Sequence, residues 1–266
     1  MANAQAPGAG ASPGEGGSSS APVSKNTLRT MEEIRAAHEG PYFSLDCYRI
    51  RWPVFGELSD ILVLDDPADA SSTARPFKTA EGWHPVAAAP VSHPPFSSTK
   101  ISIFNLENHE EYEKECCHCW DEMDENDDEA NDDMLANCPD HYHAPKPILV
   151  TSPEGGAVTV RDVVITVNPY FNAHKEKIVE VTSIGVPDNL PPGGVKYGAG
   201  GEIVEYEVSL SLEPKEMPPN AKFYAPVSLF GSMDLFCALG PEHEEREWKK
   251  RADSARSLKK RGYRDP

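Results

Sequence analysis

A run of acidic side chains in the middle of the chain sets the strongest limit on how it can fold. Residues 107–133 hold fourteen Asp and Glu residues against a single basic one, Lys114. Like charges repel one another and the run has little apolar surface to bury, so it cannot belong to a hydrophobic core. We therefore predict an acidic insert over 107–140, either a solvated, disordered loop or a docking surface for a basic partner such as a histone-like tail.

The two ends of the chain also differ in composition from a folded core. Residues 1–24 are rich in Gly, Ala, Ser and Pro and carry one charged residue, Glu15. Burial there cannot offset the backbone entropy lost on ordering, about 1–2 kcal/mol per residue. We expect a disordered tail over 1–24 and a charged helix or tail over 241–266. The core then consists of 25–106 and 141–240, one domain in size, and we expect it to form without residues 246–266.

Local patterns in the first part of the core predict a helix followed by strands. Apolar residues recur at helical spacing over 27–39 and a Gly-Pro pair ends the pattern, so we predict a short amphipathic helix. Segments 47–52, 61–64 and 100–106 have the composition of strands. The prolines between 65 and 99 exclude regular structure in our interpretation and indicate a long loop.

The second part of the core carries clearer signals. A capping-box motif, Thr159–Asp162, predicts a helix that starts there. Pro169 should break or kink this helix, because proline has no N–H and disfavours a helical residue before it, and a second helix to about Glu180 should follow. Apolar and polar residues alternate over 203–212, as in a half-buried strand. Further short apolar segments complete the core: 147–151, 223–230 and 233–239. The pattern predicts an α+β fold with a small mixed or antiparallel sheet and a few helices.

Two stretches of the second half of the chain carry a resemblance to other proteins: VTVRDVVITVNPYF at 158–171 and EREWKKRA at 245–252. They resemble proteins of filamentous fungi that have no assigned function, over about 147–251. The resemblance implies no catalytic residue.

Four candidate metal ligands lie in or beside the acidic run: Cys116, Cys119, Cys138 and His141. The first two form a C-x2-C pair and the last two repeat the same gap, a spacing similar to that of four-ligand zinc segments. Zn²⁺ binds thiolate and imidazole in a closed tetrahedron, which indicates a structural rather than a catalytic site. Cys117, His118 and His143 are spare donors that leave the ligand assignment open. The alternatives are a redox-active cysteine pair and incidental thiols in a flexible loop.

The other reactive residue types fit no catalytic motif. The sequence lacks a G-x-S-x-G nucleophile elbow, a G-x-x-x-x-G-K-[ST] phosphate loop and an H-E-x-x-H metal helix. Cys47 and Cys237 lie beside aromatic residues and are interpreted as small core side chains. Two basic clusters, 249–251 and 259–261, favour a bipartite nuclear-import signal, a solvated C-terminal helix, or pairing with the acidic insert within one molecule.

Charge and hydropathy narrow the classes of partner. The formal net charge of −18 disfavours nucleic acid, because phosphates are bound by clustered Lys and Arg. No apolar run is long enough to span a membrane, and the N-terminus lacks the basic and apolar parts of a signal peptide. We therefore expect a non-enzymatic interaction or regulatory protein of the cytosol or nucleus that binds a basic protein through its insert. The alternative is an enzyme whose site is assembled from scattered residues. The sequence does not indicate an oligomeric state.

Overall fold

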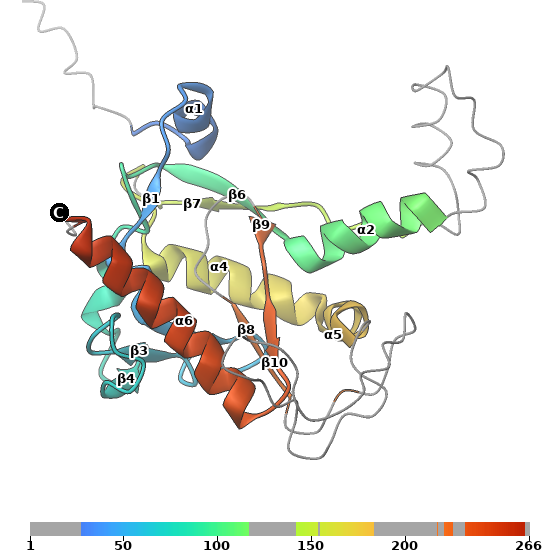
Figure 1. Cartoon of the computed structure of the whole chain (residues 1–266). Coiled ribbons are helices and arrows are strands. Elements are labelled where there is room, and N and C mark those ends of the chain that lie inside the picture. The colour runs from blue at the N-terminus through green and yellow to red at the C-terminus, as the bar shows by residue number, and fades with distance from the viewer. Residues whose placement is uncertain are drawn as a thin grey trace, which may run out of the picture.

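Helices and short strands surround one main hydrophobic core in the computed structural model, which describes residues 28–116, 142–153, 155–183, 217, 221–225 and 232–263 (Figure 1). The first half contains α1 (Met31–Ala36), β1 (Tyr42–Phe43), η1 (Leu45–Arg49), β2 (Ile50–Pro53), β3 (Leu62–Leu64), β4 (Ala74–Pro76), η2 (Pro85–Ala88), β5 (Ser92–His93), β6 (Ser98–Ile103) and α2 (Phe104–Cys116). The second half contains β7 (Ile148–Thr151), α4 (Val160–Ala173), α5 (Lys175–Ser183), β8 (Lys222–Ala225), β9 (Ser232–Met233), β10 (Phe236–Ala238) and α6 (Pro241–Lys260).

Among the described residues, the strands pair into one larger and two smaller sheets. The larger sheet has the order β10-β8-β2-β3-β4 and all its neighbours are antiparallel. A second sheet has the order β7-β6-β9, in which β6 runs antiparallel to β7 and parallel to β9. Strands β1 and β5 form a separate antiparallel pair. The α+β fold predicted from the sequence is confirmed.

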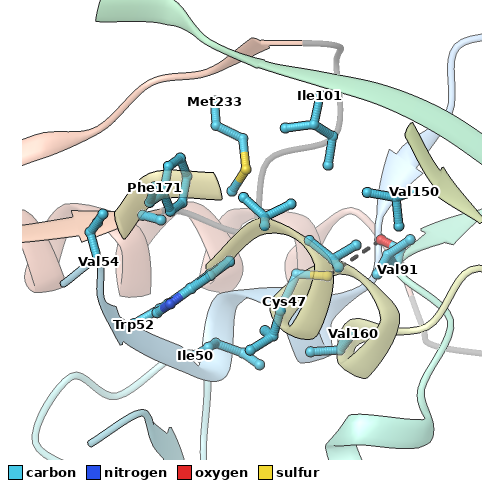
Figure 2. Close-up of a cluster of buried hydrophobic side chains, with 14 of the residues drawn as sticks. Cys47, Ile50, Trp52, Val54, Val91, Ile101, Val150, Val160, Phe171 and Met233 are labelled. Carbon is cyan, nitrogen blue, oxygen red and sulfur yellow. Dashed lines mark hydrogen bonds between the residues drawn. The ribbon is translucent and has the colours of Figure 1, made fainter. Parts of the chain in front are cut away.

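Helix α4 crosses the core beneath β6 and β7 and packs against β7 (Figure 1). Its Val167 and Phe171 are fully buried. The Phe171 ring lies 5.6 Å from the ring of Trp52 on β2, and Figure 2 shows the two side chains together in the core. The indole N–H of Trp52 donates a hydrogen bond of 3.0 Å to the side-chain oxygen of Asn168, so the buried polar atom of this large side chain is satisfied.

The start of α4 is predicted correctly, whereas its predicted end is wrong. The Thr159 hydroxyl accepts from the amide of Asp162 at 3.2 Å, and the Asp162 carboxylate accepts from the amide of Thr159 at 2.9 Å. The helix then continues through Pro169. A proline inside a helix costs about 3 kcal/mol, whereas full burial of one large apolar side chain contributes about 1.5–3 kcal/mol. Burial of both Val167 and Phe171 therefore offsets the cost.

The predicted strand over 47–52 begins as a helical turn. The Ser44 hydroxyl accepts from the amide of Asp46 at 3.2 Å, and the Asp46 carboxylate pairs with Arg49 at 2.7 Å. These contacts join residues two and three positions apart and stabilise the 3₁₀ helix η1. Only the second part of the segment is extended, as β2.

Other predictions for the first half are mixed in outcome. Strand β3 confirms the strand at 61–64, and α1 confirms a helix within 27–39, shorter than predicted. The strand over 100–106 is cut short because the chain turns into α2 after Ile103. The prediction of a loop without regular structure over 65–99 is wrong, since β4, η2 and β5 lie there.

Several predictions concern residues that are not described. The tail over 1–24 and the strand over 203–212 lie outside the described residues, as does most of the predicted insert over 107–140. The insert begins as helix, because α2 continues to Cys116.

The charged C-terminal segment packs on the core through α6. Trp248, Ala252 and Ala255 lie on one side of this helix and are 3%, 4% and 0% exposed. The Trp248 ring makes an edge-on contact with the ring of Tyr224 on β8, with centroids 5.2 Å apart. This packing argues against our expectation that the core forms without residues 246–266.

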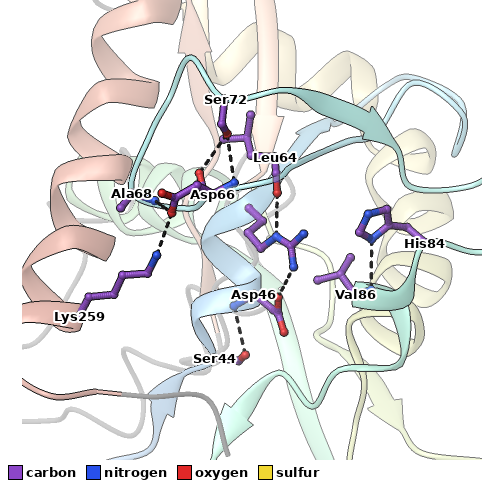
Figure 3. A network of polar contacts seen from close by, with 10 residues as sticks. Ser44, Asp46, Leu64, Asp66, Ala68, Ser72, His84, Val86 and Lys259 are labelled. Atoms are coloured by element: carbon purple, nitrogen blue, oxygen red, sulfur yellow. Dashed lines mark hydrogen bonds and ion pairs between the residues drawn. The ribbon is translucent and has the colours of Figure 1, made fainter.

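Polar contacts also tie α6 to the loop between β3 and β4 (Figure 3). Lys259 pairs with the carboxylate of Asp66 at 2.8 Å, the contact that Figure 3 shows. Arg256 donates to the carbonyl of Ala68 at 2.7 Å. The ammonium group of Lys259 and then the amide of Ala68 lower the pKa of the Asp66 carboxyl, so this anchor stays ionised at neutral pH.

Candidate functional site

Helix α2 leads from the core into the acidic segment and has two unlike faces. With about 3.6 residues per turn, Leu106 and His109 share the inner side, and Phe104, Glu111 and Tyr112 share the outer side. Leu106 and His109 are 0% and 8% exposed, whereas Phe104 and Tyr112 are 45% and 42% exposed. The outer face therefore presents two aromatic rings and a carboxylate.

The chain that returns from the acidic segment is held against α2. The ring of Tyr142 lies 5.0 Å from the ring of His109. The Glu110 carboxylate accepts from the amide of Ala144 at 3.2 Å and lies 3.6 Å from Nδ1 of His143. These contacts, which we call the α2 clamp, fix residues on both sides of segment 117–141 next to each other.

The clamp extends to α5 through Lys177. The ammonium group of Lys177 lies 4.7 Å from the centroid of the Tyr142 ring and pairs with Glu180 at 2.7 Å. Burial, followed by the charge of Lys177, lowers the pKa of His109, while burial and then Glu110 raise the pKa of Tyr142 to about 12. The imidazole is thus neutral and the phenol protonated at neutral pH.

The predicted zinc ligands fall almost entirely outside the described residues. Cys116 is the last residue of α2, with its side chain undescribed, and Cys119, Cys138 and His141 lie in the undescribed segment. In the part of the chain that is described, no group of three or more His, Cys, Asp or Glu side chains could hold a metal ion. Zinc therefore stays a prediction.

Both described cysteines outside α2 are packed in apolar surroundings, as predicted. The Cys47 thiol is 1% exposed and donates to the carbonyl of Val91 at 3.4 Å (Figure 2). Burial raises the pKa of the Cys237 thiol to about 12. Because the thiolate is the reactive form, burial keeps Cys237 unreactive at neutral pH.

A groove that sequence reasoning missed lies between α6 and the 69–71 loop. It has a volume of about 570 Å³, and Arg51 and Trp248 are among its lining residues. The Arg51 guanidinium lies 5.0 Å from the centroid of the Trp248 ring. Because these two residues lie near opposite ends of the chain, no local motif could have indicated the groove.

The two basic clusters of the predicted import signal lie mostly on α6 and are partly engaged in packing. Arg251 of the first cluster lies 5.8 Å from the ring centroid of Tyr48 and 5.6 Å from that of Trp248. Lys259 of the second cluster makes the ion pair with Asp66 described above. In the folded protein, neither cluster is therefore a free, extended segment.

Comparison with protein-family models, with curated proteins and with solved structures finds no match to this chain. The resemblance to fungal proteins accordingly stays a prediction. Across the described ranges, no helix combines the length and the apolar character needed to cross a bilayer.

Proposed function

We propose that this protein is a non-enzymatic interaction protein of the cytosol or nucleus that docks a basic segment of a partner protein. The docking surface consists of the outer face of α2 and the acidic run that continues from it. One observation carries the proposal: Phe104 and Tyr112 stay 45% and 42% exposed beside Glu111, although the opposite side of the same helix is buried.

The chemistry of this surface suits Lys and Arg side chains. Cations are attracted to the faces of aromatic rings, by about 0.5–1 kcal/mol at exposed sites, and to carboxylates. The helix rise of about 1.5 Å per residue separates the backbones of Phe104 and Tyr112 by about 12 Å, a span that about four residues of an extended partner segment would cover. The acidic run beyond α2 then supplies long-range attraction.

A titration with a synthetic peptide rich in Lys and Arg tests the proposal. Fluorescence anisotropy should show saturable binding that weakens steeply as salt rises, because exposed charges are screened over about 8 Å at physiological ionic strength. The change F104S or Y112S should weaken binding about 2- to 5-fold, the equivalent of one exposed cation–aromatic contact. Replacing five Asp residues of the acidic run with Asn should weaken peptide binding further: Asp124, Asp127, Asp128, Asp132 and Asp133.

A matched control is available on α4. Ile165 is 42% exposed, so I165S removes an apolar side chain of similar exposure from another helix and should leave peptide affinity unchanged. The changes F104S, Y112S and I165S should affect the melting temperature to a similar, small extent, since the three side chains are 45%, 42% and 42% exposed. The five-Asn variant is expected to leave it unchanged. Equal affinity of the native chain, the aromatic variants and the five-Asn variant for the peptide would refute the proposal.

We further propose that a structural zinc ion, bound by Cys116, Cys119, Cys138 and His141, gives the acidic run a fixed shape. The α2 clamp supports this proposal because it brings together the chain on both sides of the segment, which reduces the entropy cost of closing a metal loop. Metal analysis of protein purified without a histidine tag or chelator should find near one zinc per chain, lost in the double variant C116S/C138S. Metal-free protein whose thiols at 116, 119 and 138 all react rapidly would contradict it.

A further inference from the structure

The groove beside α6 is lined by three cationic side chains (Arg51, Lys249 and Arg256) and four anionic ones (Asp69, Glu244, Glu245 and Asp253), and two of the cations stand out. Arg51 rises from β2 into the groove, and Lys249 lies on its rim. Neither makes an ion pair within the described part of the chain. The neighbouring cations are paired: Lys222 with Glu244 at 3.0 Å, Lys250 with Glu247 at 2.7 Å, and Arg256 with Asp253.

Arg51 is also short of hydrogen-bond acceptors. Its Nη2 donates to the carbonyl of Ala70. Its Nε is buried with no hydrogen-bond partner among the described residues, and the same holds for the indole nitrogen of Trp248. A buried donor without an acceptor costs stability, and such a donor commonly marks the place of a bound water, ion or ligand group.

A second guanidinium strengthens the local positive charge. Arg251 lies 5.6 Å from the centroid of the Trp248 ring, so Arg51 and Arg251 both contact this ring. Burial lowers the pKa of both guanidinium groups, yet arginine stays protonated in proteins. Arg251 is not among the residues that line the groove, whereas Arg51 is, and Arg51 is poorly solvated with no carboxylate in ion-pair contact among the described residues; the charge of Glu244 only opposes the lowering of its pKa. A further anion nearby would stabilise the Arg51 cation.

The carboxylates that line the groove are mostly engaged elsewhere. Glu244 accepts from the Tyr224 hydroxyl at 2.5 Å as well as binding Lys222. Asp69 accepts from the amide of Ser71 at 2.9 Å and from its hydroxyl at 2.7 Å. Glu245 lies at the exposed mouth, where solvent screens its charge.

We propose that this groove is a binding site for a small ligand that carries a carboxylate or phosphate group. The anionic oxygens would accept hydrogen bonds from Arg51 and Lys249. A volume of about 570 Å³ is in the range of small-molecule sites, about 300–1,000 Å³. The site is independent of the α2 docking surface, since the acidic segment starts on the other side of the molecule from α6 (Figure 1).

Calorimetric titration of the full chain with inorganic phosphate and, separately, with citrate tests the inference at constant ionic strength. Saturable binding of either probe is expected, and the better one identifies the preferred anion. K249M should weaken binding about 3- to 10-fold; its side chain is exposed, so the fold should be unaffected. R51M should weaken it about 10-fold or more, as loss of a charged hydrogen bond does.

The control is K250M, which removes an exposed charge from the same helix at a residue outside the groove. Its affinity for the preferred probe should match that of the native chain. Absence of saturable binding to both probes at millimolar concentration would overturn the inference, and so would equal weakening by K249M and K250M.

Discussion

Replacing Trp248 with Ala should remove a large part of the stability of the fold. The side chain is 3% exposed, and its ring contacts those of Tyr224 and Phe236 at centroid distances of 5.2 and 5.6 Å. Truncating a buried Trp to Ala costs about 3–5 kcal/mol, and here the guanidinium groups of Arg51 and Arg251 also lose the ring that they contact. The total stability of a domain is typically about 5–15 kcal/mol, so W248A should be close to unfolding.

Urea unfolding followed by far-ultraviolet circular dichroism measures this effect without relying on tryptophan fluorescence. The free energy of unfolding of W248A should fall by about 3–5 kcal/mol, and a chain that ends at Gly240 should be at least as unstable. K250A is the matched control on the exposed side of α6 and should change stability by about 0.5 kcal/mol or less. A loss below about 1 kcal/mol in W248A would show that α6 is an accessory to the core, as the sequence had indicated.

Three other substitutions test local contacts. T159A should lower the free energy of unfolding by about 1 kcal/mol through loss of the α4 cap, whereas T159S keeps the hydroxyl and should recover most of it; equal values would exclude the cap. N168A leaves the buried N–H of Trp52 without its acceptor and should cost about 1–3 kcal/mol, and a neutral result in urea unfolding would show that the bond is dispensable. Because the folded-state pKa of His109 is lowered, protonation favours the unfolded chain, so stability should fall as pH drops through about 6.5. Urea unfolding between pH 7.5 and 5.5, as about one unit either side of this value, should show a smaller fall for H109Q, and an unchanged pH dependence would contradict the assignment.

Features that depend on nearby residues could be predicted from the sequence. The α4 cap is such a case, since it joins Thr159 to Asp162 three positions away. The strand predicted over 61–64 is a short apolar run, which needs no knowledge of the rest of the chain. The pattern of predicted elements likewise indicated the α+β class correctly.

Features that depend on distant residues could not be predicted in this way. The break expected at Pro169 is absent because Phe171 packs against Trp52, a contact that no local pattern contains. The charged residues around Trp248 indicated a solvated helix, although its apolar side meets Tyr224 on another element. The groove at Arg51 could not be predicted for the same reason, since its lining residues come from β2 and α6, which are far apart in the sequence.

The α2 clamp explains how a long acidic segment can interrupt this domain without disrupting its core. The contacts of Glu110 with Ala144 and of His109 with Tyr142 set the separation of the two chain ends on their own. Once the ends are fixed, the entropy cost of the intervening chain grows slowly, by about 0.6 kcal/mol for each doubling of its length. The acidic run can therefore change in length or charge at small cost to the fold. The inner side of α2 secures the core, and its outer side, on which Phe104 and Tyr112 are 45% and 42% exposed, is the surface that we propose for docking.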